Sequence, residues 1–564
     1  MNNITKKLAL FSSLSLLTIG AGLAQDNKDW GEPSGSLEDA RLLIEKETVL
    51  ELPTRSRSYG KMNKIEREQS NQAQEYNLQL MDMYLGSITP KIEAMQVAPE
   101  PPEYIEGNYL KAGFGNYVSP YFEGFIGSER NNQYEYNARI KHFSSMQGPV
   151  DKENSAMSLN NIDLDGKYFL TDGQVNASLG IDRRMAHFYG YIPTPGQEIN
   201  SDDIKQIYSI VKAGAGYEST SVTSTLDWGA GFNFYRLTDN FNASENNLDL
   251  HANGSYELSD ESEVYANLNL ILGSRTDTEK TNRNLYKFGG GYHFTTNGFQ
   301  IKAGAKVAYA ADTMLMNGSQ FRIYPDVHAS YNLIDRKLTA FAKLSGDLEQ
   351  ITLRSLIDEN IFIGQDVTLT NQDTKLAFEG GISSHLTGNL GISAKVGYAN
   401  VKNLPFFLNQ QFNQQQFDVV YDEQSINILS VNADVSVEIQ KFRGMFSTGF
   451  YNYGTPNLEE AWHRPNVVNR LSGSYQLDDK LYANLEFFHM GGIKAKDFTT
   501  DTTVDLDNIF DFNLRVDYVF YDKFSGFLAV NNVLSKNYER YLHYKSKGIN
   551  ALIGVTYSFS FLDF

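Results

Sequence analysis

The chain has 564 residues, a formal net charge of −19 and no cysteine. Without cysteine there is neither a disulfide framework nor a lipid-anchoring thiol, and the acidic balance argues against nucleic acid as a partner. No internal segment offers the roughly 18 consecutive apolar residues of a transmembrane helix, so an α-helical membrane protein is excluded. Tyrosine (34), phenylalanine (35) and glycine (45) are abundant and proline (14) is scarce, which favours strands and turns.

Residues 1–24 are predicted to be a signal peptide. Lys6 and Lys7 form a basic n-region, and the apolar run LALFSSLSLLTIGAGLA closes on small residues just before Gln25. The alternative, a short anchor helix, is disfavoured because the segment is short and lacks a stop-transfer flank. We therefore expect an exported protein without a lipid anchor.

Residues 25–106 differ in composition from the remainder. A helical pattern, LEDARLLIEKE, follows Ser36, and a proline-rich stretch at 98–104 is expected to be an extended linker. The region is too polar and too interrupted for a globular core of its own. We expect a partly helical periplasmic arm.

Residues 107–564 alternate between apolar and polar side chains with a period of two, which is the pattern of β-strands. Tight polar turns alternate along the chain with longer excursions. Transmembrane β-barrels show the same alternation, with short periplasmic turns and long extracellular loops. The pattern predicts an all-β fold, an antiparallel barrel of about 22 strands, with both termini in the periplasm. The longer excursions are expected around 147–155, 191–203, 238–247, 273–284, 311–320, 353–373, 402–416, 454–463, 493–503 and 536–548.

The two faces of each strand favour a barrel over a soluble sheet. No unpaired strand edge is stable in lipid, so the sheet has to close, and a charge facing lipid near the midplane costs about 2–4 kcal/mol. A sandwich would bury the apolar face against a second sheet, and a propeller would show a blade-length repeat, which this sequence lacks. The charges of the stretch FDFNLRVDYVF are therefore expected to face the lumen. They are Asp511, Arg515 and Asp517.

The chain ends on INALIGVTYSFSFLDF, a strand with one apolar and one polar face. It resembles the C-terminal signal by which outer-membrane barrels are recognised for insertion, which implies the barrel-assembly machinery and outer-membrane lipid as partners. The residues that carry this resemblance are Tyr557, Phe559, Phe561 and Phe564. The apolar-polar alternation breaks at the end of this stretch. Phe564 lies three residues after Phe561, so a period-two pattern places the two side chains on opposite faces.

The stretch FLAVNNVLSKNYERY resembles a strand and loop near the C-terminus of TonB-dependent receptors of Gram-negative outer membranes. The match rests chiefly on Val530, Asn531, Asn532 and Tyr538, although the family often has an acidic residue where Ser535 and Lys536 stand here. Residues 108–128 look like the first barrel strands of receptor-like proteins common in Bacteroidetes. The resemblance implies a receptor-like barrel of 22 strands that takes up a solute.

One departure from these receptors concerns the plug, a domain of well over a hundred residues that fills the receptor lumen. The region 25–106 is shorter than such a plug, and its sequence does not resemble one. We therefore expect a barrel that lacks a plug. Four alternatives stay open for the wide lumen: loops and inward side chains fill it, the arm enters it, a partner occupies it, or it is an open pore.

A candidate TonB box lies within the arm. Glu47, Thr48, Val49, Leu50 and Glu51 resemble the acidic-hydrophobic segment that pairs with TonB. The simpler interpretation, the end of an amphipathic helix before Pro53, is favoured. TonB or another periplasmic partner is expected to bind through residues 25–106.

Side chains for catalysis or metal binding are sparse. The nine histidines stand singly and none has a metal-ligand spacing, so no metal or cofactor is expected. His142 with Ser144 and Ser145 could form the Ser–His pair of a barrel hydrolase, but a wall histidine without a role is favoured, and we predict that the protein is not an enzyme. The predicted function is passage or uptake of a solute across the outer membrane. The alternative is a scaffold barrel in an outer-membrane secretion or assembly complex.

Overall fold

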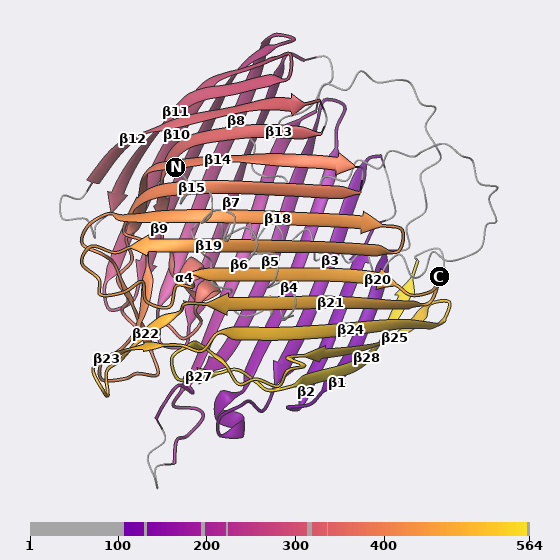
Figure 1. Ribbon diagram of the computed structural model, residues 1–564, viewed down its shortest axis with the longest axis vertical. Coiled ribbons are helices and arrows are strands. Elements are labelled where there is room, and N and C mark those ends of the chain that lie inside the picture. The colour runs from indigo at the N-terminus through magenta and orange to yellow at the C-terminus, as the bar shows by residue number, and fades with distance from the viewer. Residues whose placement is uncertain are drawn as a thin grey trace, which may run out of the picture.

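The computed structural model describes residues 107–128, 132–192, 198–220, 224–312, 319–335, 337–387 and 389–560. In these ranges a single 22-stranded antiparallel sheet forms the wall of a barrel (Figure 1). Each wall strand pairs with its neighbours along the chain, and β1 pairs with both β2 and β28, so the sheet closes on itself. The predicted antiparallel barrel of about 22 strands is confirmed. The signal peptide and the arm at 25–106 lie outside the described residues.

The wall strands are long and follow one another around the barrel. They are β1 (Asn108–Gly115), β2 (Ser119–Gly127), β3 (Tyr134–Ser145), β4 (Met157–Phe169), β5 (Gly173–His187), β6 (Lys205–Ser219), β7 (Leu226–Asp239), β8 (Ser244–Ser259), β9 (Ser262–Thr276), β10 (Lys280–Thr296), β11 (Phe299–Asp312), β12 (Ser319–Ile334), β13 (Leu338–Gln350), β14 (Asn371–Thr387), β15 (Leu390–Lys402), β18 (Ile426–Ile439), β19 (Phe442–Gly454), β20 (Val467–Gln476), β21 (Leu481–Gly491), β24 (Ile509–Tyr521), β25 (Phe524–Asn531) and β28 (Asn550–Phe559). A 3-10 turn, η2 (Lys152–Ser155), lies between β3 and β4. Among the described residues, no helix is long and apolar enough to cross a membrane.

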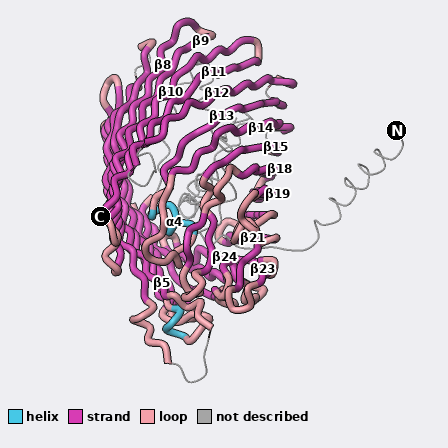
Figure 2. The backbone as a smooth tube through the Cα atoms, turned by 90° about the vertical axis from the view of Figure 1, so that its left-hand side faces the viewer, coloured by secondary structure: helices cyan, strands magenta, loops and turns pink. Residues whose placement is uncertain are grey.

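The connections differ between the two rims of the barrel. One rim has short turns such as 440–441, and the other has long connections such as 351–370 and 532–549. The long-loop rim lies on the left of Figure 1 and faces the viewer in Figure 2. The short-long alternation of the sequence thus becomes a physical difference between the two ends of the barrel.

Two of the predicted long excursions are mostly strand. β7 ends at Asp239 and β8 begins at Ser244, so the stretch 238–247 holds only a short turn. The stretch 273–284 likewise belongs largely to β9 and β10, which are joined by residues 277–279. Both faces of these strands are polar near the long-loop rim, where the period-two signal disappears although the ladder of backbone hydrogen bonds continues.

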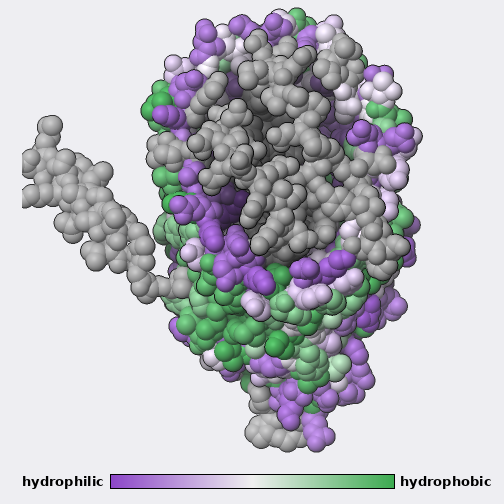
Figure 3. All heavy atoms as spheres, turned by 90° about the vertical axis from the view of Figure 1, so that its right-hand side faces the viewer, coloured by the Kyte–Doolittle hydropathy of each residue, from purple (hydrophilic) through white to green (hydrophobic). Residues whose placement is uncertain are grey.

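The inner and outer faces of the wall have opposite polarity. In β24, Asp511 and Asp517 are buried at 1% and 3% exposure, whereas Tyr518 and Phe520 on the alternate face are 49% and 51% exposed. Figure 3 looks at the short-turn rim, where hydrophilic residues border the lower edge of the hollow and a hydrophobic area lies below it. Apolar residues outside and polar residues inside are the arrangement of a barrel immersed in lipid.

The barrel closes where β28 meets β1. Gly554 of β28 lies opposite Gly113 of β1, and the flanking strands place Phe527 and Tyr121 in the same row. The rings of Tyr121 and Phe527 pack edge to face over the glycines, with their centroids 6.3 Å apart. A Cβ on Gly554 would lie 2.5 Å from the Phe527 ring, so the seam needs a residue without a side chain at this point.

The seam yields a first prediction. Gly554→Ala should lower the unfolding temperature of the barrel, because the added methyl group collides with the Ala112 carbonyl oxygen and with the Phe527 ring. Overpacking of this kind costs about 1–3 kcal/mol. Heat-dependent mobility on a denaturing gel measures the transition. Gly166→Ala is the matched control, since the atom nearest to a Cβ there is the Glu135 carbonyl oxygen at 3.9 Å. Equal transition temperatures for the two variants would contradict the prediction.

Candidate functional site: the mouth cap and the lumen wall

Several long loops fold together at the long-loop end of the barrel (Figure 2). We call them the mouth cap. It consists of residues 351–370, 403–425, 455–466, 492–508 and 532–549, which include α4 (Leu353–Glu359), β16 (Phe406–Asn409), β17 (Phe417–Val420), β22 (Lys494–Asp497), β23 (Thr502–Asp505), β26 (Glu539–Tyr541) and β27 (Tyr544–Lys545).

The mouth cap has a hydrophobic core of its own. Leu353, Leu356 and Ile357 lie on one face of α4 and are buried together with wall residues such as Ile210 and Leu237, whose side chains are fully covered. Burying a side chain of this size contributes about 1.5–3 kcal/mol. The cap loops therefore form a packed layer against the inner wall of the barrel and do not simply extend into solvent.

Arg464 joins three segments of the cap. Its Nη1 lies 2.6 Å from Glu359 Oε1 at the end of α4, and its Nη2 donates to the carbonyl oxygen of Pro405 at 2.6 Å. Tyr541 donates from its hydroxyl to the backbone carbonyl of Glu359 at 2.7 Å. Because Arg464 is only 3% exposed, these partners are needed to compensate the burial of its charge.

His463, next to Arg464, forms a second joint. Its Nδ1 donates to the carbonyl oxygen of Phe407 at 2.8 Å, and the backbone N–H of Leu542 donates to its Nε2 at 3.2 Å. These bonds require a neutral ring with its proton on Nδ1, since Nε2 has to accept. Burial lowers the pKa of His463 from 6.5 to about 3, so the ring stays neutral near neutral pH.

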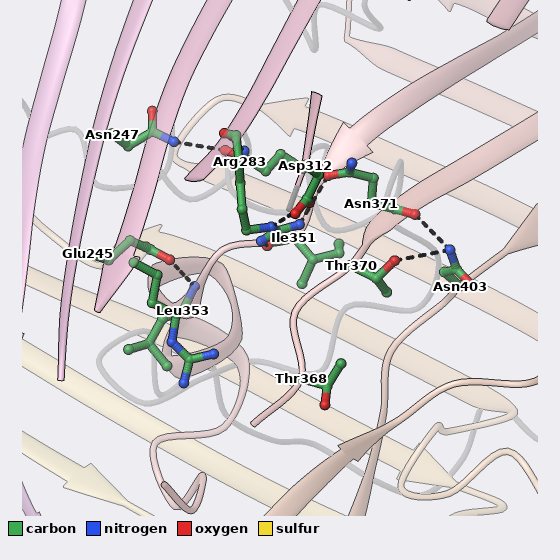
Figure 4. A network of polar contacts seen from close by, with 12 residues as sticks. Glu245, Asn247, Arg283, Asp312, Ile351, Leu353, Thr368, Thr370, Asn371 and Asn403 are labelled. Carbon is green, nitrogen blue, oxygen red and sulfur yellow. Dashed lines mark hydrogen bonds and ion pairs between the residues drawn. The ribbon is translucent and has the colours of Figure 1, made fainter. Parts of the chain in front are cut away.

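Arg283 of β10 attaches the α4 segment to the wall (Figure 4). Its Nε donates to Asp312 Oδ2 of β11 at 2.8 Å, and this ion pair is almost completely buried. The two remaining nitrogens donate to the carbonyl oxygen of Ile351 at 2.5 Å and to Asn371 Oδ1 at 3.0 Å. Since Ile351 and Asn371 flank the loop between β13 and β14, one guanidinium fixes both ends of that loop.

Glu245 of β8 holds the other side of α4. Its carboxylate accepts the backbone N–H of Leu353 at 2.7 Å and that of Arg354 at 3.2 Å, and the Tyr235 hydroxyl donates to it at 2.7 Å. A carboxylate at a helix N-terminus satisfies N–H groups that have no partner within the helix and interacts favourably with the helix dipole.

The lumen wall carries a compact charge network beside the seam. Glu123 is 7% exposed and lies 3.7 Å from the Lys111 ammonium and 3.6 Å from the Arg139 guanidinium. Arg515 makes two hydrogen bonds to Asp517, at 2.8 and 2.7 Å, and its guanidinium stacks on the Phe527 ring. Opposite charges thus lie side by side along this part of the lumen wall.

The residues of the family-like strand and one of the expected lumen charges come together. Val530 and Asn531 end β25. Asn532, in the left-handed region with φ 47°, donates from its side-chain amide to two backbone carbonyls of the following loop. Tyr538, later in that loop, donates its hydroxyl to Asp511 of β24. Asn532 therefore shapes the base of the loop, and Tyr538 ties the loop to the wall.

The other expected site residues are only partly described. Tyr557 and Phe559 lie on β28, where their rings stack with centroids 5.6 Å apart. Phe561, Phe564 and the candidate TonB box at 47–51 lie outside the described residues. Their roles in insertion and energy coupling stay predictions.

Sequence reasoning missed the mouth cap. The segment 353–373 was expected to be a loop, yet Leu353, Leu356 and Ile357 have the i, i+3, i+4 spacing of an amphipathic helix. The adjacent pair Phe406 and Phe407 is a similar signal, because loops exposed to water rarely carry such residues in sequence. In the part of the chain that the structure describes, no three His, Asp or Glu residues group as metal ligands do.

No protein-family model and no curated protein matches the chain. Several solved structures do. The FrpB iron transporter of Neisseria meningitidis (F5-1 variant) has a TM-score of 0.63 at 10% identity, over 80% of this chain and 82% of that one. The chain shares the barrel fold of this transporter and of the two proteins that follow. The ferric-catecholate import receptor Fiu of E. coli (closed form) has a TM-score of 0.59 at 10% identity, over 80% and 81% of the two chains.

A third similar structure is FpvA of P. aeruginosa in complex with an iron-loaded heterologous pyoverdine, with a TM-score of 0.60 at 12% identity over 80% of this chain and 71% of that one. At this identity the likeness concerns the fold. The expected resemblance to the barrel of TonB-dependent receptors is confirmed at that level.

The Arg283 anchor yields a second prediction. Arg283→Met removes the cation that pairs with the buried Asp312 carboxylate, and breaking a buried ion pair costs about 3–5 kcal/mol. It also removes the Arg283 hydrogen bonds at both ends of residues 351–370. We expect faster cleavage of this segment in limited proteolysis. Arg354→Met is the control, since that side chain stacks on the Tyr235 ring at 4.8 Å and makes a weaker contact. Equal cleavage rates in the two variants would contradict the role of Arg283.

The His463 joint yields a third prediction. Below pH 6.5 an opened cap takes up a proton on His463, whereas the closed cap does not until about pH 3. The closed state should therefore lose stability as the pH falls from about 6.5 to 3, by up to about 1.4 kcal/mol per pH unit. Amide hydrogen exchange in residues 455–466, corrected for intrinsic rates, measures this. In His463→Asn the loss of stability with falling pH should become smaller, because only other cap groups such as Asp422 still contribute to it. An unchanged pH dependence would contradict the assignment.

Proposed function

We propose that this protein takes up a solute across the outer membrane of a Gram-negative bacterium. The observation that carries the proposal is a closed 22-stranded barrel whose fold is shared over 80% of the chain with the FrpB iron transporter and the ferric-catecholate import receptor Fiu. A polar inner wall and an apolar outer wall suit passage of a hydrophilic solute through lipid. The named cargo of these similar proteins makes an iron chelate the first class of solute to test.

In this proposal the mouth cap regulates entry from the cell surface. The long-loop rim is the extracellular one, because short turns belong on the periplasmic side. The joints at Arg464 and His463 hold the cap segments together, and a passing solute has to separate them. The lumen charges Asp511, Arg515 and Asp517 then contribute to selectivity. Uptake of this kind involves no covalent chemistry.

The arm at residues 25–106 completes the proposal on the periplasmic side. After removal of residues 1–24 it would be available to TonB or another periplasmic partner, with residues 47–51 as the candidate contact. The barrel-assembly machinery would insert the protein through its C-terminal strand. Outer-membrane lipid would surround the apolar wall.

The alternative is a closed scaffold barrel in a secretion or assembly complex. It is favoured by the tight packing of the mouth cap, whose hydrophobic clusters extend from the loops onto the inner wall. A scaffold has no need to open, and its arm would serve as a docking element.

A fourth prediction separates transport from scaffolding. The purified protein should bind a ferric chelate from a panel of siderophores, measured by quenching of its intrinsic fluorescence. Replacing residues 352–369 by a short Gly-Ser linker should raise single-channel conductance in planar bilayers, because α4 then no longer occupies the mouth. The intact protein is the reference.

The scaffold alternative predicts a different result. The protein would bind none of the chelates, would stay closed after the loop replacement and after deletion of residues 25–105, and would co-purify with a partner in a fixed ratio. That combination would overturn the proposal of solute uptake.

A further inference from the structure

Three polar side chains form a row on the outer face of the barrel wall. His142 and Ser144 lie two residues apart on β3, and Asn160 of β4 is the cross-strand partner of His142. All three share the face on which Ile140 and Ile162 are exposed at 41% and 42%. The alternate residues of β3 face the lumen, as the contact between Arg139 and Glu123 shows.

The row has the hydrogen-bond order of a catalytic triad. Ser144 Oγ lies 3.3 Å from His142 Nε2, and His142 Nδ1 lies 2.7 Å from Asn160 Oδ1. A hydroxyl, an imidazole and a group that orients the imidazole are the parts needed to activate a serine nucleophile.

The amide of Asn160 sets the tautomer of the imidazole. Its Nδ2 lies 3.5 Å from the carbonyl oxygen of Arg183, so its Oδ1 is the atom that faces His142. An amide oxygen only accepts, and Nδ1 of His142 must therefore carry the proton. Nε2 is then left with a free lone pair directed at the Ser144 hydroxyl. This is the tautomer that a general base requires.

The position of the row points to a lipid substrate. His142 stands two residues beyond Ile140 toward the long-loop rim, a distance of about 6–7 Å along a strand. On the neighbouring strand Arg183 is exposed and is the cross-strand partner of Asn160. A serine nucleophile beside an exposed cation, at the edge of an apolar wall, is placed where the ester and phosphate groups of membrane lipids lie.

In place of the sequence-based prediction that His142 has no role and that the protein is not an enzyme, we propose that Ser144, His142 and Asn160 hydrolyse an acyl ester of an anionic membrane lipid. The inference rests on the location of the barrel in the outer membrane, as given under the proposed function. Arg183 would bind the lipid phosphate. Ser144 and His142 are the catalytic residues, and Asn160 is a positioning residue that acts through the imidazole.

The reaction balances without a cofactor. Ser144 Oγ bonds to the acyl carbon while its proton passes to His142 Nε2. The ester C–O bond then breaks, and the leaving alkoxide takes that proton to become an alcohol. Water attacks the acyl-serine, gives a proton to His142 and releases the fatty acid, and the proton returns to Ser144 Oγ. Ser144 is only 9% exposed, so the lipid ester and the hydrolytic water both require local movement of the neighbouring side chains to reach its Oγ.

A similar arrangement on the opposite face provides an internal comparison. Thr295 Oγ1 lies 3.4 Å from His293 Nε2, and His293 Nδ1 lies 3.0 Å from Glu263 Oε1. This set stands on β9 and β10 near the short-turn rim and on the lumen face, because the alternate residue Tyr292 is the exposed one. Cross-strand spacing alone thus produces such a row. What distinguishes the row at Ser144 is its position on the outer face of the wall, where it borders the exposed Arg183.

The fifth prediction tests this activity on the full-length protein in detergent and in vesicles. An alkyl fluorophosphonate should label Ser144, as located by peptide mass spectrometry. Release of fatty acid is measured from phosphatidylglycerol vesicles and, separately, from vesicles of lipopolysaccharide, which decides between the two sources of the ester. Ser144→Ala and His142→Ala should lower the rate by at least about 10³-fold.

Matched variants separate chemistry from folding. Ser145→Ala alters the adjacent serine, which is fully buried on the lumen face and donates to the carbonyl oxygen of Gln147 at 2.7 Å, and it should keep the activity, as should Thr295→Ala. Asn160→Ala should lower kcat with little change in KM, and Asn160→Asp should restore part of it. A loss that is equal in Ser145→Ala and Ser144→Ala would overturn the proposal.

The outcome is independent of solute uptake. Ser144→Ala should bind ferric chelates as the intact protein does, because the row faces away from the lumen. If Ser144 is not labelled and neither lipid is cleaved faster than by Ser144→Ala, the row is a structural element of the wall and the hydrolase proposal fails. If the intact protein hydrolyses lipid but binds no ferric chelate, solute uptake is refuted and the hydrolase proposal is not affected.

Discussion

The closure of one antiparallel sheet is the constraint on which the rest of this structure depends. A backbone N–H or C=O group without a partner is too costly in lipid, so the wall is stable only when β28 pairs with β1. Closure assigns each side chain to one of two environments by its parity along the strand. It also brings the strands together at Gly113 and Gly554, where the rings of Phe527 and Tyr121 cover the gap that the glycines leave.

A closed wall creates an interior in which polar and apolar groups must both find partners. Near the seam the charges do so among themselves, with Glu123 between Lys111 and Arg139. At the long-loop end, apolar residues of the loops cover apolar residues of the wall. Arg283 crosses that boundary, because it neutralises Asp312 on the wall and holds Ile351 of the cap. The cap is therefore joined to the barrel by buried polar contacts as well as by hydrophobic packing.

The sequence predicted the features that are local along the chain. Strands, parity and the short-long alternation of turns follow from residues two apart, and the resemblance around Asn532 pointed to the barrel type. The α4 segment and the cap joints depend on contacts between distant loops, such as Arg464 with Glu359, which no periodicity encodes. The pairing of Ser144 with His142 was visible in the sequence, but Asn160 joins them only through the register of β3 and β4.

The order of strands also determines how this protein can be made. Every wall pairing joins consecutive strands except the one between the first and the last. Such near-neighbour pairings form with little loss of chain entropy, whereas the seam requires the two most distant elements to meet. A chain interrupted during synthesis would expose two unpaired edges, whatever its length. Completion of β28 is thus the step that converts an aggregation-prone sheet into a finished wall, and it makes the last strand synthesised the natural checkpoint for quality control.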